Sequence, residues 1–343
     1  MKTVVYSCPF IPCEWIAAHG LRPWRISPQA TATATTGPTT GVCSYVRAFV
    51  DSACQDDPAS GSRPVAVITT TLCDQMRRAH DLIARNFDGA AFLMNVPSTW
   101  GSPESQRLYI DELKRLGRFL RNLSGQSPSA ARLAGVMLEH DNLRSWLRAA
   151  RLRVPAKEHS RLLLEIASGQ RPSIDQDRPA PSPIGIPVAL LGGPLRREDF
   201  DIFDLVEAAG GQVVLDACDS GERTLPAPFD RRRLRQWAED ADGDGASCQP
   251  LLAELADAYF GNIPHPFRRP NSRLYRYLEK EPPARGARAI ILRRYQWCDI
   301  WNGETQRLKD WLNVPVLELH IGGAGQDRPR QAGRIRALME TLS

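Results

Sequence analysis

A strand, a cysteine and a helix follow one another between residues 63 and 87, and this order strongly limits the folds open to the chain. Val65–Thr71 is a β-branched, apolar run of strand length that follows a proline. From Asp74 to Phe87, apolar residues recur at helical spacing, with arginines between them. Cys73 lies at the junction, so we expect its sulfur at the carboxyl end of a parallel strand and beside a helix N-terminus. Open α/β sheets place their ligand sites there, and a helix N-terminus favours a thiolate or a negatively charged metal–sulfur cluster.

Two further cysteines occupy equivalent places. Cys43 falls in the first turn of a helix that begins within Val42–Val50, and Cys298 follows the predicted strand Arg288–Leu292. Two parallel α/β domains that face each other would bring Cys43, Cys73 and Cys298 together at the carboxyl ends of their strands. Three thiolates with one open position suit a [4Fe–4S] cluster whose fourth iron can bind a ligand. The alternative is that these are structural cysteines, which are often buried.

The α/β patterns lie at the two ends of the chain and flank a helical part. From Glu104 to about Gln170 the pattern is almost entirely helical, and a proline-rich linker follows at 171–185. We therefore predict three parts: an N-terminal α/β domain over 1–103 with two of the cysteines, a helical segment and linker over 104–185, and a C-terminal α/β domain over 186–343 with the third cysteine.

Composition describes an ordinary globular protein. The 343 residues leave room for two domains, and 42% of them are hydrophobic and 24% charged. We expect neither a membrane span nor a secretory signal, because no run of about 18 apolar residues occurs and the first residues lack a basic region before an apolar one. The cytoplasm is then the expected location. The net charge of +5 suits a cleft for a nucleotide or coenzyme A, or an acidic partner, and no nucleic-acid-binding motif accompanies it.

The eight cysteines are many for a cytosolic protein, in which structural disulfides are rare. No C-x2-C pair occurs, so the spacing excludes a zinc ribbon and a ferredoxin-type cluster motif, and a zinc protein fits poorly. Any cluster must therefore collect cysteines from distant parts of the fold. We expect Cys218 and Cys248 to be packing or surface thiols.

Several segments, in order, resemble one known family. CPFIPCEWIAAHGLRP at 8–23 resembles its entry segment Cys-x-x-x-Pro-x-Glu-x-x-x-Ala-x-Gly-x-x-Pro, GVCSYVRAFVD at 41–51 its first ligand block, and TTTLCDQMRR at 69–78 its Thr-Cys-Asp block. GGP at 192–194, DLVEAAGGQVVLDACDSGER, YQWCDIWNGETQRLKDWLNVPVLELHI and GRIRALMETL follow in the expected order. Over nearly its whole length the chain thus resembles the 2-hydroxyacyl-CoA dehydratase/benzoyl-CoA reductase superfamily.

The resemblance implies an α/β fold of two Rossmann-like or flavodoxin-like parallel-sheet domains with an additional helical segment. It implies an oxygen-sensitive [4Fe–4S] cluster held by Cys43, Cys73 and Cys298. In relatives two homologous subunits pair, and a separate ATP-dependent iron–sulfur activator delivers one electron; this chain has no P-loop, so ATP hydrolysis would belong to that activator. The cluster would pass the electron to an acyl-CoA thioester or an aromatic ring. Glu14 matches the entry-segment glutamate near the bound acyl group, which makes it a candidate for proton handling or for holding the substrate hydroxyl.

Other interpretations remain open at this point. Glu14 could simply stabilise the first turn of a short helix through the helix dipole. A double-cubane [8Fe–9S] reductase of the same superfamily would need roughly three more cysteine ligands, which Cys8, Cys13 and Cys54 could supply. The chain could also be an electron-relay subunit beside a catalytic homologue, or an iron-free α/β scaffold with buried cysteines.

Overall fold

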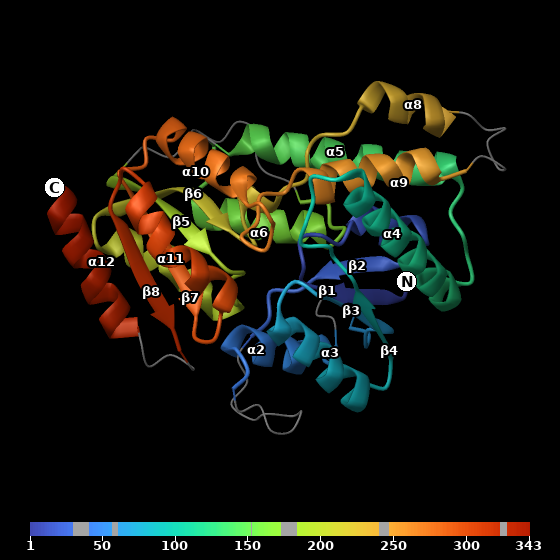
Figure 1. The fold of residues 1–343 in the computed structure, drawn as a ribbon, viewed down its shortest axis with the longest axis horizontal. Helices are drawn as coiled ribbons and strands as arrows, with labels where there is room; N and C mark the ends of the chain where they lie inside the picture. Colours follow the sequence, from blue (N-terminus) through green and yellow to red (C-terminus); the bar gives the residue numbers. More distant parts are fainter. Residues whose placement is uncertain (30–40, 57–60, 152, 173–183, 240–246, 323–327) are drawn as a thin grey trace.

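The computed structural model describes residues 1–343 except 30–40, 57–60, 152, 173–183, 240–246 and 323–327. It contains two four-stranded sheets in which every pair of neighbouring strands is parallel (Figure 1). The strands of the first sheet are β1 (Thr3–Tyr6), β2 (Arg22–Arg25), β3 (Ala66–Thr70) and β4 (Ala90–Met94). Those of the second sheet are β5 (Ile186–Gly192), β6 (Gly211–Cys218), β7 (Ala289–Tyr295) and β8 (Val316–Ile321).

Helices follow the strands of both sheets. In the N-terminal half they are α1 (Cys13–Ala18), α2 (Ser44–Ala53), α3 (Asp74–Asn86), α4 (Pro103–Ser124), α5 (Ala130–Ala150) and α6 (Ala156–Ala167). In the C-terminal half they are α7 (Asp201–Ala208), α8 (Arg231–Glu239), α9 (Gln249–Ala256), α10 (Ser272–Ala284), α11 (Asp299–Trp311) and α12 (Arg328–Leu342). This half also contains the short 3₁₀ helices η1 (Arg197–Phe200) and η2 (Glu222–Thr224) and the π-helix η4 (Asp257–Gly261). None of the helices in the described part of the chain is both long and apolar enough to span a membrane.

The two sheets have the same strand order. The first runs β2-β1-β3-β4 and the second β6-β5-β7-β8, so each starts with its second strand, followed by its first, third and fourth. This is the flavodoxin-like order, in which the chain leaves the first and third strands in opposite directions and opens a crevice between them. The structure confirms the predicted α/β fold with two parallel-sheet domains.

Local sequence explains why these elements form. All five residues of β3 are buried, as expected for a parallel strand covered on both faces by helices. The α3 helix buries Met76, Ala79, Leu82 and Ile83 on one face, the apolar stripe that the sequence predicts. The start of α4 is fixed by Ser102, whose hydroxyl accepts a hydrogen bond from the Ser105 amide at 3.2 Å.

The first sheet packs on helices from both ends of the chain. On one face lies a core that includes α1, α4 and α5, together with α9 and η4 from the C-terminal half. Figure 1 shows α8 and α9 lying beside α5 and α4, far from the second sheet. Residues of the segment 229–263 therefore share the core of the N-terminal half, although they follow β6 in sequence. The domain boundaries predicted at residues 104 and 186 from the order of elements along the sequence remain predictions.

The opposite face of the first sheet shares one apolar core with the second sheet. Val5 and Val67 belong to the same buried cluster as Leu190 and Ile291. Polar contacts cross the same border. The Arg25 guanidinium donates to the Asp219 carbonyl at 2.6 Å, and the Ser27 hydroxyl donates to the Leu195 carbonyl at 3.0 Å. The two sheets are thus held at a fixed mutual position.

Gly192, the last residue of β5, lies too close to the neighbouring strand β7 to carry a side chain. Its φ is +143°, and a β-carbon there would overlap the Arg293 carbonyl oxygen on the neighbouring strand β7. We expect Gly192→Ala to lower the free energy of unfolding by about 2–4 kcal/mol, because strand separation or backbone strain is unavoidable. Gly303→Ala is the matched control, since Gly303 lies in α11 with open space around it, and this change should be neutral or slightly stabilising. Denaturant unfolding of both variants measures the difference; equal stabilities would contradict the prediction.

Candidate functional site

A cavity of about 370 Å³ lies where the carboxyl ends of the two sheets meet. The loops after β1 and β3 line it from the N-terminal half, and those after β5 and β7 line it from the C-terminal half. These four loops leave the sheets at the points where the strand order reverses, which is where open α/β sheets bind their ligands. Two such crevices face one another here and form one cavity.

The structure brings the three predicted cysteines into this cavity. Cys43, Cys73 and Cys298 all line it, and each is the residue immediately before a helix: α2, α3 and α11 respectively. Cys298 comes from the second sheet and the other two from the first. The expected convergence of strand–cysteine–helix junctions from two domains is therefore observed. That these cysteines hold a cluster remains a prediction.

Burial governs the chemistry of these thiols. It raises the pKa of Cys73 and of Cys298 to about 12, and it raises the pKa of Cys43 above its ordinary value as well. Backbone amides at the helix starts, such as those of Met76 and Trp301, oppose this effect without cancelling it. As free thiols the cysteines are therefore protonated at neutral pH and poor nucleophiles. A metal that displaces the protons would convert them to thiolates, which suits ligation rather than covalent catalysis.

A fourth cysteine faces the same cavity. Cys8, in the loop after β1, is 5% exposed and lines the cavity with the other three. The other two cysteines considered for a second cubane lie elsewhere. Cys13 borders a separate cavity of about 30 Å³, and Cys54 ends α2 near Arg63.

The donor set fits an iron–sulfur cluster better than a single ion. Thiolate sulfur is the usual ligand of such clusters, and each cysteine of a cubane binds a different iron, so the sulfurs need not crowd together. Among the described residues, the group whose ligand atoms all lie within 4.8 Å of one another is Cys13, Glu14 and His140, outside the cavity. The cavity cysteines do not form such a compact group.

Glu14 lies in a buried polar cluster beside the cavity rather than in its wall. Its carboxylate pairs with the Arg144 guanidinium and accepts a hydrogen bond from the Tyr259 hydroxyl at 2.7 Å. The Cys13 sulfur lies 3.6 Å from the same carboxylate and 3.4 Å from Nδ1 of His140. Burial alone would raise the pKa of Glu14, but Arg144 and the hydrogen bonds hold it below its ordinary value. The carboxylate is thus charged, fully buried and already paired.

A family profile described as 2-hydroxyglutaryl-CoA dehydratase, D-component, matches residues 8–342. This span includes all four cysteines that line the cavity and every other lining residue except Ser7. The chain belongs to this family. No curated protein matches it at a significant level. Membership makes the chain a dehydratase-type component, and the designation of a single component implies a partner subunit.

The cavity wall of this family member contains polar residues that the sequence did not single out. Asp219 follows β6 and binds the Arg223 guanidinium, and Nε2 of His265 lies 3.4 Å from its carboxylate. Burial raises the pKa of Asp219, but His265 and Arg223 outweigh it and bring the value to about 2. Asp219 lies in the DACDSGER segment, so its position after a strand was a usable signal. His265 lies in a proline-containing loop that offered none.

Loss of the Glu14 charge should destabilise the fold. In Glu14→Gln the buried Arg144 guanidinium loses its closest counter-charge and keeps only the more distant Asp141 carboxylate at 3.9 Å, so we expect a loss of about 3 kcal/mol in the free energy of unfolding. Asp111→Asn breaks the exposed pair with Lys114 and should change nothing measurable. Urea unfolding of the two variants provides the comparison. A Glu14→Gln protein as stable as the wild type would show that the ion pair does not support the fold.

Asp219 should make the protein acid-sensitive. Its folded pKa of about 2 lies below its ordinary value of 3.8, so its contribution to stability is complete above pH 3.8 and disappears as the pH falls to about 2. That contribution is about 2 kcal/mol for a shift of this size. We therefore expect the stability gap between wild type and Asp219→Asn to shrink by about 2 kcal/mol between pH 5 and pH 2. Denaturant titrations across this range test it, and a constant gap would contradict it.

Proposed function

We propose that this chain is the cluster-bearing component of a 2-hydroxyacyl-CoA dehydratase-type enzyme and that Cys43, Cys73 and Cys298 hold one [4Fe–4S] cluster. The observation that carries the proposal is that three cysteines from two domains, each at a helix start, line one cavity at the meeting point of two sheets. When bound, the cluster would supply one-electron chemistry at low potential.

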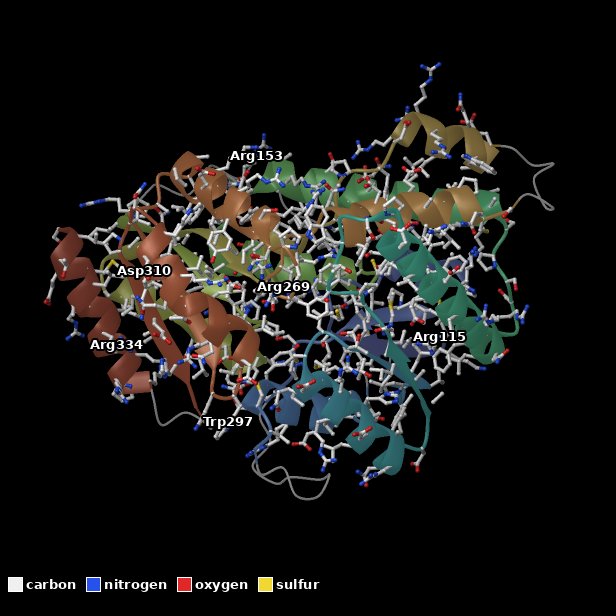
Figure 2. All side chains as sticks on the ribbon, viewed as in Figure 1. Arg115, Arg153, Arg269, Trp297, Asp310 and Arg334 are labelled. Carbon is white, nitrogen blue, oxygen red and sulfur yellow. The ribbon has the colours of Figure 1, made fainter. Side chains whose placement is uncertain are left out.

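The protein around the cysteines suits an anionic cluster. Three helix N-termini place their positive dipole ends next to the sulfurs, which favours negative charge there. The rings of Tyr45 and Tyr295 pack 5.7 Å apart in the cavity wall and come from opposite domains. Trp297, labelled in Figure 2 where the C-terminal half borders the N-terminal half, lines the cavity and is 55% exposed. These aromatic side chains would limit the access of water to the cluster.

The family match supports a proposal for the substrate and the partners. We propose an acyl-CoA thioester of a 2-hydroxy acid as the substrate class, a homologous second subunit, and a separate ATP-dependent iron–sulfur activator as the electron source. Arg77 lines the cavity on its exposed side, where a phosphate-bearing ligand could meet positive charge. The overall charge of +5 agrees with an anionic ligand.

The role of Glu14 in proton handling or substrate binding rests on its match to the family's entry segment. Its burial and its pairing with Arg144 favour a positioning role for the neighbouring Cys8–Pro12 turn instead. The two roles differ in their consequences. A positioning role couples loss of activity to loss of stability in Glu14→Gln, whereas a direct role lowers activity in a protein that is as stable as the wild type.

The positions of the remaining cysteines support a single [4Fe–4S] cluster over a double-cubane cluster. A double-cubane cluster would draw on Cys8, Cys13 and Cys54, but only Cys8 among these lines the cavity. Cys13 is engaged with Glu14 and His140, and Cys54 lies at the far end of α2 from Cys43.

Iron and acid-labile sulfide analysis of strictly anaerobically purified protein tests the proposal. We expect about four of each per chain, and loss of most of both in Cys73→Ala. Cys218→Ala is the matched control, because Cys218 is fully buried but lies outside the cavity, and it should keep the full complement. Folded wild-type protein that takes up no iron on reconstitution would overturn the proposal. About eight iron per chain would instead support the double-cubane alternative.

A further inference from the structure

We propose that Cys8 is the fourth protein ligand of the cluster, so that this component holds a cluster closed by four cysteines, which passes electrons on without binding substrate at an iron. The inference rests on the proposed function, because it requires the cluster at Cys43, Cys73 and Cys298. It makes Cys8 a cluster ligand and makes the component an electron relay. A cluster held by three cysteines gives Cys8 no role.

The sheet geometry places Cys8 beside the other ligands. β1 and β3 are neighbours, with Tyr6 opposite Ile68, and both strands end at the switch point. Continuing this register sets Cys8 opposite Thr70, three residues before Cys73. The two cysteines therefore leave adjacent strands at the same edge. Cys8 and Cys73 both line the cavity at this edge.

An unpartnered hydroxyl points to the same place. Thr70 is fully buried and lines the cavity, and its hydroxyl has no hydrogen-bond partner in the described part of the chain. Buried hydroxyls are seldom left without a partner. Burial raises the pKa of the Cys8 thiol to about 11, and the neighbouring Thr70 hydroxyl and Phe10 amide lower it in part. A Cys8 thiolate bound to iron would give the Thr70 hydroxyl the acceptor that it lacks.

Three other polar side chains of the cavity wall, those of His265, Asp219 and Tyr295, already have partners. Nδ1 of His265 accepts from the Phe267 amide at 3.1 Å, and its Nε2 faces Asp219. The Asp219 carboxylate binds Arg223. The Tyr295 hydroxyl donates to Asp199.

The two acidic residues at the helix starts point outward. The Asp74 side chain is fully exposed, and Asp299 is exposed as well. Cys8 is therefore the one further cysteine available to a fourth iron among the described residues that line the cavity.

The number of cysteines decides what the cluster can do. With three protein ligands, one iron keeps an open position that an external ligand can enter. With four, each iron is bound by a cysteine, and the cluster can exchange electrons but not bind a substrate oxygen. The substrate would then be activated in the partner component.

Exogenous ligand binding separates these cases. The full chain is purified anaerobically, its cluster is reduced, and its electron paramagnetic resonance spectrum is recorded with and without cyanide as the probe ligand. We expect no change in the wild type. In Cys8→Ala we expect about four iron to remain and the spectrum to shift with cyanide, because one iron has become accessible. Cys218→Ala, which removes a buried cysteine outside the cavity, should behave like the wild type.

The outcomes distinguish this inference from the proposed function. A cyanide-induced shift in the wild type, which needs no variant, would overturn the role of Cys8 and leave the three-cysteine cluster intact. A Cys8→Ala cluster that ignores cyanide as the wild type does would have the same meaning. If Cys8→Ala fails to fold, Cys8→Ser keeps a smaller ligand, and a spectrum identical to that of the wild type would overturn the proposal. A wild type without any cluster would end both proposals.

Discussion

Everything at this site depends on two parallel sheets whose carboxyl edges meet across one shared apolar core. In a parallel sheet all strands end at the same edge, so loops from distant parts of the chain are delivered together. Here the same strand order occurs twice, and the core that contains Val67 and Ile291 fixes the two edges against each other. Without this contact, Cys298 would be separated from Cys43 and Cys73. The proposed ligand set is thus a property of the domain interface, and neither sheet contains it alone.

Buried ion pairs hold the loops around the cavity at defined positions. Asp199 is bound by Arg293 at 3.0 Å and by Arg196 at 3.0 Å, and it also accepts a hydrogen bond from Tyr295 in the cavity wall. Asp219 plays the same part on the opposite side. Removing such charges from water is costly, and each pair is stable only because its partner stays in place. The main effect of these ion pairs is therefore to fix one arrangement of the loops, and their contribution to net stability is smaller. A site formed by side chains from several loops requires such a fixed arrangement.

The buried thiols and the polar groups beside them are consistent with a metal centre. Burial keeps the cysteines protonated, whereas helix starts and nearby amides are arranged to favour negative sulfur. This combination is unfavourable for a free nucleophile and favourable for a thiolate whose charge is balanced by iron. The unpartnered Thr70 hydroxyl fits the same interpretation.

The sequence by itself determined the strand–cysteine–helix junctions, the α/β class and the family, because hydrophobic periodicity and motif order are local properties of the chain. It also allowed the convergence of Cys43, Cys73 and Cys298 to be predicted, since the ends of parallel strands share one edge of the sheet.

Only the tertiary structure decided which other groups join them. Glu14 meets Arg144 across 130 positions in sequence, and α8 and α9 return to the first domain after β6. Cys8 was one of several candidate thiols until packing separated it from Cys13 and Cys54. Partners of buried polar groups are set by packing between distant segments, and no local pattern encodes that packing.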